Sequence, residues 1–255
     1  MILDRFRLDG QVAIVTGAGR GLGLGMAAAL AEAGADLVAV SRSGVAPELA
    51  ARVAAAGRRV HMVAADVGEL NDAGAEALLA EALGQFGRVD ILLNNAGITH
   101  RARAEDFATA EWDAVLAVNL HAVFLLCRTV GRELLRQGHG KIINIASLLS
   151  YQGGILVPAY AASKHAVAGL TKALANEWAG RGVCVNAIAP GYMATDLTQG
   201  LRDDPDRNRQ VSERIPAGRW GTPDDLAGAA VFLASAASDY VHGQLLAVDG
   251  GWLAR

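Results

Sequence analysis

The chain has 255 residues, of which 52% are hydrophobic, and its 23 basic and 26 acidic side chains leave a net charge of −3. This length and apolar content suit one large α/β domain with a sizeable core. No run of five like charges occurs, so the composition excludes the basic footprint of a nucleic-acid-binding protein and an acidic tail. We therefore expect a small-molecule partner.

Signals for a membrane, a metal or a disulfide are equally weak. The longest apolar stretches are interrupted by Gly, Asn or charged residues well short of a membrane span, and Met1–Arg5 lacks a signal-peptide layout. Cys127 and Cys184 both lie in apolar patterns, which is typical of buried reduced thiols. The six histidines show no metal-binding spacing. These features predict a cytoplasmic protein with no membrane segment and no catalytic metal.

Short β-branched runs alternate with Ala/Leu-rich runs along the chain. The expected strands are, in order, Val12–Thr16, Asp36–Val40, Arg59–Ala64, Asp90–Asn94, Lys141–Ala146, Val183–Ala189 and Leu245–Val248. The expected helices are Leu22–Ala33, Pro47–Ala56, Asn71–Phe86, Glu111–Arg136, Tyr160–Ala179 and Pro223–Ala234. Near-continuous apolar strands separated by helices predict a doubly wound, Rossmann-like parallel sheet. No linker divides the chain, so residues 1–255 are predicted to form one domain.

The polar stretch Gly191–Pro216 shows no clear periodicity, and we predict a loop there. Long loops in compact domains are often lids over a site. This stretch is therefore a candidate substrate-covering segment, although a plain solvated insertion is the alternative.

A glycine-rich turn, Thr16–Gly23, follows the first strand and opens the first helix. Glycines there allow a tight turn and bring amides at a helix N-terminus close to a pyrophosphate. The GxxxGxG spacing differs from the familiar GxGxxG, but its position in a βαβ unit indicates dinucleotide binding. The residues that we expect to contact the dinucleotide there are Gly17, Arg20, Gly21, Leu22 and Gly23.

The end of the second strand bears on the choice of dinucleotide. Folds that prefer NAD usually carry an acid there, whereas this chain has Ser41 and Arg42. A guanidinium suits a 2′-phosphate, and Arg20 could reach the same group, so NADP(H) is favoured and NAD(H) remains possible. Arg42 could instead point to water. After the third strand, Asp66 and Val67 could contact adenine, or Asp66 could cap the next turn.

Polar and small residues follow the fourth and fifth strands at the carboxyl edge of the predicted sheet, where ligands bind in open α/β folds. Asn95, Ala96 and Gly97 would allow a ligand ring to approach closely. Ser147 closes the fifth strand. Asn119 is polar within an apolar helical pattern, so it could hold a water or bond to a distorted helix backbone.

Tyr160 and Lys164 form an i,i+4 pair within a helix-forming run. This spacing places a phenol and an ammonium on one face, and a nearby cation favours the phenolate, which makes the tyrosine a usable acid-base group. The alternative is an amphipathic helix in which the tyrosine packs and the lysine extends to water.

Together, these motifs and Pro190-Gly191 resemble the short-chain dehydrogenase/reductase family in the same order over essentially the whole chain. The resemblance implies that Tyr160 is the acid-base group, that Lys164 lowers its pKa and binds the nicotinamide ribose, and that Ser147 polarises the substrate oxygen. It also implies that Asn119 holds a relay water. The implied nicotinamide contacts further along the chain are Pro190, Gly191 and Thr195.

Within that family, segments such as Tyr151–Gly154, Asn186–Thr195 and Arg214–Gly221 resemble bacterial dehydrogenases of 2-dehydro-3-deoxy-D-gluconate or 2-deoxy-D-gluconate. That group prefers NAD, and the Ser41-Arg42 pair departs from it. The resemblance implies a sugar-acid substrate with Arg101, Gln152 and Tyr192 as contacts. A 3-oxoacyl-thioester reductase and a non-catalytic dinucleotide sensor are the alternatives.

The C-terminus bears on assembly. Trp252 and Leu253 would form an exposed apolar pair at the chain end, which burial against a neighbouring subunit would protect. Because the family usually forms tetramers, we expect a homotetramer. The alternative is that the tail folds back on its own subunit.

Overall fold

The sheet is built from seven parallel strands in the order β3-β2-β1-β4-β5-β6-β7, in a computed structural model that describes residues 1–255. The strands are β1 (Val12–Thr16), β2 (Asp36–Ser41), β3 (Val60–Ala64), β4 (Ile91–Asn94), β5 (Gly140–Ile145), β6 (Val183–Pro190) and β7 (Leu245–Val248). The strand order reverses between β1 and β4, which is the switch point where doubly wound folds bind ligands. The predicted fold class is confirmed.

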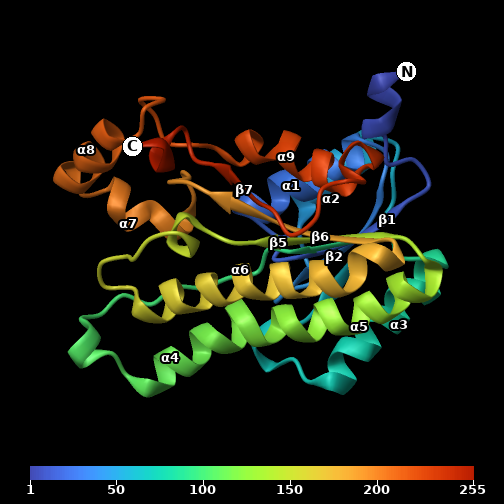
Figure 1. Ribbon diagram of the computed structural model, residues 1–255, viewed down its shortest axis with the longest axis horizontal. Helices are drawn as coiled ribbons and strands as arrows, with labels where there is room; N and C mark the ends of the chain where they lie inside the picture. The colour runs from blue at the N-terminus through green and yellow to red at the C-terminus, as the bar shows by residue number, and fades with distance from the viewer.

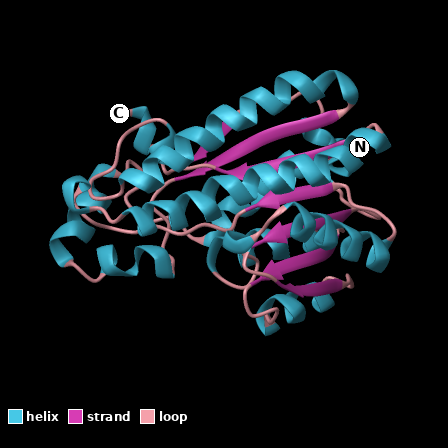
Figure 2. Ribbon diagram, turned by 90° about the horizontal axis from the view of Figure 1, so that it is seen from below, coloured by secondary structure: helices cyan, strands magenta, loops and turns pink.

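Helices cover both faces of the sheet (Figures 1 and 2). They are α1 (Gly21–Glu32), α2 (Pro47–Ala55), α3 (Asp72–Phe86), α4 (Thr109–Leu116), α5 (Ala122–Gln137), α6 (Pro158–Trp178), α7 (Gln199–Arg202), α8 (Pro205–Arg214) and α9 (Ala227–Ala234). One core cluster packs α1, α2 and α9 on one face, and a second packs α3, α5 and α6 on the other. Central strands such as β1 and β6 are buried throughout, which explains their uninterrupted apolar sequences.

The predicted helix Glu111–Arg136 is interrupted. A π-helical turn, η4 (Ala117–His121), separates α4 from α5 and contains the fully buried Asn119. Such turns insert one extra residue into a helix and are frequent at functional sites. Likewise, the predicted helix at Pro223 begins with a 3₁₀ turn, η8 (Pro223–Leu226), before α9.

The helical run Thr109–Gln137 also corrects the expectation that every apolar stretch stops well short of a membrane span. An 18-residue window within it has a mean hydropathy of 1.7. By length and composition alone, this helix is long and apolar enough to cross a membrane. Just over half of that window, 56%, is buried inside the fold, where Leu125 and Leu126 are part of the core. Its apolar character therefore has an explanation in the packing of α5 against the sheet.

The prediction of a loop over residues 191–216 is wrong, because the segment contains a 3₁₀ turn, η7 (Asp196–Thr198), followed by α7 and α8. Asp204 caps α8 by accepting hydrogen bonds from the amides of Asp206 and Arg207, and Pro205 occupies the first turn. An Asp-Pro start is a recognised helix signal. Figure 1 shows α7 and α8 beside the C-terminus, at the opposite end of the molecule from the N-terminus.

Candidate active site

The glycine-rich turn between β1 and α1 forms a narrow cradle at the carboxyl edge of the sheet. Gly17 and Gly21 have positive φ angles of +67° and +56°, which favour glycine. A Cβ on Gly23 would lie 2.2 Å from the Gly17 carbonyl oxygen, so no larger residue fits. Leu22 is half-buried in the first turn of α1. The cradle presents helix N-terminal amides to a space that suits a phosphate.

Asn95, the residue after β4, stabilises this cradle. Its Nδ2 donates to the carbonyl oxygens of Thr16 and Gly17 at 2.9 and 3.2 Å, and Thr16 Oγ1 accepts from the amides of Asn95 and Ala96 at 3.0 and 3.1 Å. The side chain of Asn95 therefore holds the turn in place. Thr16 is a positioning residue that was not among the predicted site residues, although a threonine at the end of β1 is a signal for it.

The end of β2 carries the residues expected to select the cofactor. Ser41 Oγ is buried without a hydrogen-bond partner, and a Cβ on Gly19 would lie 3.3 Å from Ser41 Cβ. Arg42 is exposed and makes no ion pair. Arg20 Nη1 instead lies 2.9 Å from Asp196 Oδ2, and both side chains are about three-quarters exposed. An orphaned hydroxyl beside the phosphate cradle and a free guanidinium fit a phosphorylated ribose.

Asp66 accepts a hydrogen bond from the Gly68 amide at 2.9 Å and so caps the turn η2 (Val67–Glu69), which was one of its two expected roles. Its side chain is exposed, whereas Val67 is buried. Only one carboxylate oxygen is used in the cap, so the second remains available to a ligand.

Three of the four predicted catalytic residues meet where β5 ends and α6 begins. Ser147 follows β5, and its Oγ accepts from the Leu149 amide at 3.1 Å. Lys164 Nζ lies 5.6 Å from the centre of the Tyr160 ring and donates to the Ile145 carbonyl oxygen at 2.6 Å. The helix thus presents phenol and ammonium to the same space, as the i,i+4 spacing predicts.

Burial dominates the electrostatics of this group. It raises the pKa of the Tyr160 phenol above its ordinary value, and the neighbouring Ser147 hydroxyl acts in the opposite direction. Burial also lowers the pKa of the Lys164 ammonium to about 8. The expected lowering of the tyrosine pKa by Lys164 is not present here, because the ammonium bonds to a carbonyl rather than to the phenol.

Asn119 joins the π-helical turn to the strand end and to α6. Its amide exchanges two 2.9 Å hydrogen bonds with the backbone of Ile98 and donates to Ser163 Oγ at 3.2 Å. Ser163 in turn donates to the Tyr160 carbonyl oxygen at 2.7 Å. A Cβ on Gly97 would lie 3.4 Å from Asn119 Oδ1 and 3.9 Å from Lys164 Nζ, so the predicted strand-end glycine borders this group. Ser163 was missed, although it lies between the paired tyrosine and lysine.

The end of β6 closes the other side of the site. Pro190 is buried, and the Gly191 amide donates to the Val248 carbonyl oxygen at 2.9 Å. A Cβ on Gly191 would approach Asp249 Cα to 2.6 Å, which explains the glycine. The Thr195 methyl group would lie 3.8 Å from a Cβ on Gly21, so Thr195 borders the cradle.

The predicted substrate contacts divide into two groups. The neighbour of Arg101, Ala102, donates to the carbonyl oxygen of Leu156 at 3.1 Å, which joins the Arg101 segment to the loop that begins at Gln152. Leu156 has a φ of +66°, and it alone among the non-glycine residues adopts a positive φ, a strain typical of functional loops. Tyr192 belongs to an aromatic cluster that packs on Leu148, whose carbonyl oxygen also accepts a hydrogen bond from the Gln152 amide at 3.2 Å.

This aromatic cluster connects α8, the C-terminus and the catalytic loop. The Tyr192 ring lies 4.6 Å from that of Trp252 and 5.5 Å from that of Trp220. Trp252 is buried in its own subunit against Leu148 and Ile215. The tail therefore folds back on its own subunit, which was the alternative, and Trp252 is buried without the neighbouring subunit that was expected to cover it.

Comparison with known proteins agrees with this geometry. Residues 17–253 match the family model described as enoyl-(acyl carrier protein) reductase. The chain is 56% identical to a 2-dehydro-3-deoxy-D-gluconate 5-dehydrogenase of Dickeya dadantii (strain 3937), covering 100% of both chains. It is 55% identical to the protein of the same name from Bacillus subtilis (strain 168), covering 99% of this chain and 98% of that one. The chain belongs to the short-chain dehydrogenase/reductase family.

A solved structure extends this result. The gluconate 5-dehydrogenase from Burkholderia cenocepacia J2315, in complex with NADP and tartrate, superposes with a TM-score of 0.95 at 45% identity and covers 100% of both chains. The family membership and the oxidoreductase class predicted from the sequence are both confirmed.

Proposed function

We propose that this protein is an NADP(H)-dependent dehydrogenase that interconverts a secondary alcohol and a ketone on a sugar acid of the 2-dehydro-3-deoxy-D-gluconate or 2-deoxy-D-gluconate type. The observation that carries this proposal is the grouping of Ser147, Tyr160 and Lys164 beside a phosphate cradle, in a chain 56% identical to an enzyme named for such a sugar acid. An intact phenol-ammonium pair argues against a non-catalytic sensor, which needs no acid-base group.

The residues present fit an NADP molecule. The cradle formed by Gly17, Gly21 and Gly23 suits the pyrophosphate, and the unpartnered Ser41 hydroxyl with Arg42 suits the 2′-phosphate. NADP in the Burkholderia relative supports this preference over NAD. When bound, the nicotinamide supplies the hydride acceptor or donor.

The side chains of the protein handle the proton. Burial keeps the Tyr160 phenol protonated, which is the form that donates to a substrate carbonyl oxygen in the direction of reduction. Ser147 donates a hydrogen bond to the same oxygen. Lys164, with a pKa of about 8, exchanges a proton near neutral pH, and Asn119 holds the strand end beside it.

A sugar acid needs a cation for its carboxylate and polar partners for its hydroxyl groups. Arg101 is exposed and makes no ion pair, so its guanidinium is free for a carboxylate. Gln152 and Tyr192 offer an amide and a hydroxyl. We further propose that residues 191–216 cover the substrate, because the Arg20–Asp196 ion pair ties this segment to the cofactor cradle.

We also propose a cytoplasmic homotetramer. A surface groove of about 420 Å³ lies between α4–η4–α5 and α6 and is lined mainly by apolar side chains, among them Leu116, Leu120, Phe124 and Leu170. Phe124 is 40% exposed, and an apolar groove on two long helices suits a two-fold contact with a second copy.

Phe124→Glu should lower the assembly state in analytical ultracentrifugation. Tyr240→Glu, at a fully exposed aromatic ring, should not; a monomeric wild type at micromolar concentration would exclude the tetramer.

Initial rates with both nicotinamides against a panel of sugar acids and acetoacetyl thioesters test the proposed activity. We expect NADP-dependent oxidation of a deoxy sugar acid or NADPH-dependent reduction of a keto-deoxy sugar acid. The second candidate is reduction of the ketone of a 3-oxoacyl thioester; the description of the matching family model, enoyl-(acyl carrier protein) reductase, shares with this candidate only the thioester class of substrate. Turnover of thioesters with no activity on any sugar acid would make that candidate the function.

A further inference from the structure

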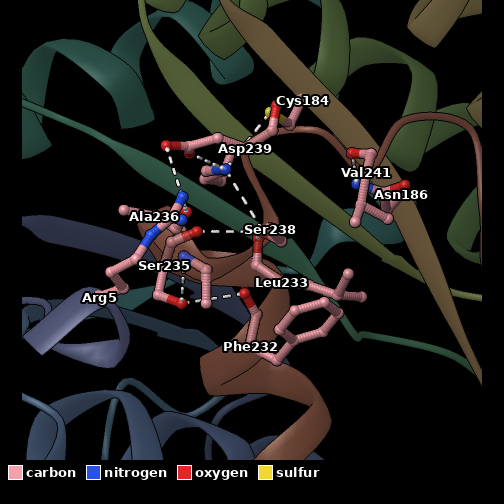
Figure 3. Close-up of polar contacts among 12 residues, drawn as sticks. Arg5, Cys184, Asn186, Phe232, Leu233, Ser235, Ala236, Ser238, Asp239 and Val241 are labelled. Atoms are coloured by element: carbon pink, nitrogen blue, oxygen red, sulfur yellow. Dashed lines mark hydrogen bonds and ion pairs between the residues drawn. The ribbon is translucent and has the colours of Figure 1, made fainter. Parts of the chain in front are cut away.

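A polar cluster lies at the amino edge of the sheet, at the opposite end of β5 and β6 from the catalytic residues. Lys141 near the start of β5 is paired in register with Cys184 of β6, and Lys141 Nζ donates to Cys184 Sγ at 3.3 Å. The ammonium also contacts Asp239 Oδ1 at 2.8 Å and Ser238 Oγ at 3.3 Å. Figure 3 shows Cys184, Ser238 and Asp239 turned toward one another.

This cluster is buried yet reachable. Lys141 and Cys184 are 9% and 5% exposed, but both line a cavity of about 420 Å³ that also borders Asp239 and His139. The cavity is large enough to admit hydrogen peroxide, since a water-sized molecule needs only ~10–15 Å³ of free volume. Neither residue has a part in the dehydrogenase mechanism proposed above. A buried thiol with an amine as its neighbour therefore lacks an explanation from that mechanism.

We propose that Lys141 and Cys184 form a peroxide-responsive site, in which oxidation joins the two side chains by a reversible covalent sulfur–nitrogen bond. Sulfenic acids condense with nearby nucleophiles, including nitrogen, before further oxidation. The lysine stem is flexible, so the bond can close by a side-chain movement while the paired strands stay in place.

The chemistry balances with one hydrogen peroxide. Cys184 loses its thiol proton and attacks the peroxide as the thiolate. The sulfur is oxidised by two electrons to a sulfenic acid as the O–O bond breaks, and the leaving hydroxide takes up the released proton to form one water. Lys141 then loses a proton to the Asp239 carboxylate, and its amine attacks the sulfur. The S–N bond forms as the S–O bond breaks, and a second water leaves. A thiol reductant breaks the S–N bond and restores both groups.

The second cysteine provides a matched comparison. Cys127 is fully buried between Asn94 and Asn144, whose side chains are its hydrogen-bond partners, and burial raises the pKa of its thiol to about 12. No amine lies beside it. Because peroxide reacts with thiolates, Cys127 should remain reduced under conditions that oxidise Cys184.

The test is intact and peptide mass spectrometry of the full-length protein after treatment with hydrogen peroxide. We expect the wild type to lose two hydrogen atoms, with peptides containing Lys141 and Cys184 joined, and a thiol reductant to reverse the change. Cys127→Ser should behave in the same way, which distinguishes this bond from a disulfide. In Lys141→Arg, which keeps the charge opposite Asp239, Cys184 should instead proceed to sulfinic acid.

Three results would overturn the proposal. They are an unmodified Cys184, the same oxidised forms of Cys184 in wild type and Lys141→Arg, and a bridge that retains an oxygen atom. Because mass is the readout, each of these results is independent of the proposed enzyme activity.

Discussion

The two ends of the sheet each bury a lysine, but in different surroundings. At the amino edge, Lys141 has a carboxylate partner in Asp239 at 2.8 Å. At the carboxyl edge, Lys164 has only the carbonyl oxygen of Ile145, and burial lowers its pKa to about 8. A buried cation without a counter-ion costs stability, and such costs concentrate where chemistry is done. This difference supports our proposals that catalysis takes place at the carboxyl edge and that Lys141 at the amino edge has a separate role.

The largest expected effect comes from removing the phenol. Tyr160→Phe keeps the ring and loses the proton donor, so turnover should fall by ~10²-fold or more. Binding of NADPH, measured by fluorescence titration, should change little. Turnover within a few-fold of wild type would show that another group transfers the proton.

The second effect is on stability. The folded pKa of Lys164, about 8, lies below its ordinary value of 10.5. The unfolded chain therefore binds more protons between these pH values, and the stability of the wild type should rise with pH across that window. Burying the charged Lys164 ammonium costs roughly 3 kcal/mol of folding free energy, and this cost is present in full below pH 8. The substitution Lys164→Met removes the cost, because methionine carries no charge.

Denaturant unfolding of wild type and Lys164→Met at several pH values checks this expectation. The variant should gain most over the wild type near pH 7, and the difference should shrink as the pH approaches 10. Parallel stability curves would mean that the Lys164 ammonium is fully solvated or paired in solution.

The third effect is on the preference between NADP and NAD. Ser41→Asp places a carboxylate beside the proposed 2′-phosphate, so the ratio of kcat/KM for NADP over that for NAD should fall by about 10-fold or more. Ser43→Asp, at an exposed position two residues further on, is the matched control and should leave the ratio unchanged. No shift in Ser41→Asp would place the adenosine ribose elsewhere.

The smallest effect concerns substrate binding. Arg101→Ala should raise KM for the sugar acid by roughly 3- to 10-fold with little change in kcat, because an exposed guanidinium contributes uniform binding. Arg103→Ala, where the guanidinium is also exposed, should not. Equal effects of the two substitutions would remove Arg101 from the substrate site.

Much of the fold could be predicted from the sequence, because buried parallel strands require continuous apolar runs and the helices carry a clear periodicity. The spacing of Tyr160 and Lys164 also predicted a shared face, since an α-helix fixes that geometry. The π-helical turn at Asn119 and the hydrogen bond from Asn119 to Ser163 could not be predicted, because they depend on contacts between distant elements.

The C-terminal half shows why other predictions failed. Residues 191–216 are polar enough to resemble a loop, yet Asp204 and Pro205 start a helix whose apolar residues pack on Trp252. The tail seemed exposed because its partners, Leu148 and Ile215, lie far away in sequence. Both the helix within residues 191–216 and the burial of the tail depend on packing between residues that are distant in the sequence.

The most direct test of the difference between the two ends of the sheet is the turnover of Lys164→Met and Lys141→Met, measured in one assay with NADP(H) and a sugar acid. We expect a loss of ~10²-fold for Lys164→Met and a change of less than about twofold for Lys141→Met. Equal losses in the two variants, or a larger loss for Lys141→Met, would contradict the assignment of catalysis to the carboxyl edge.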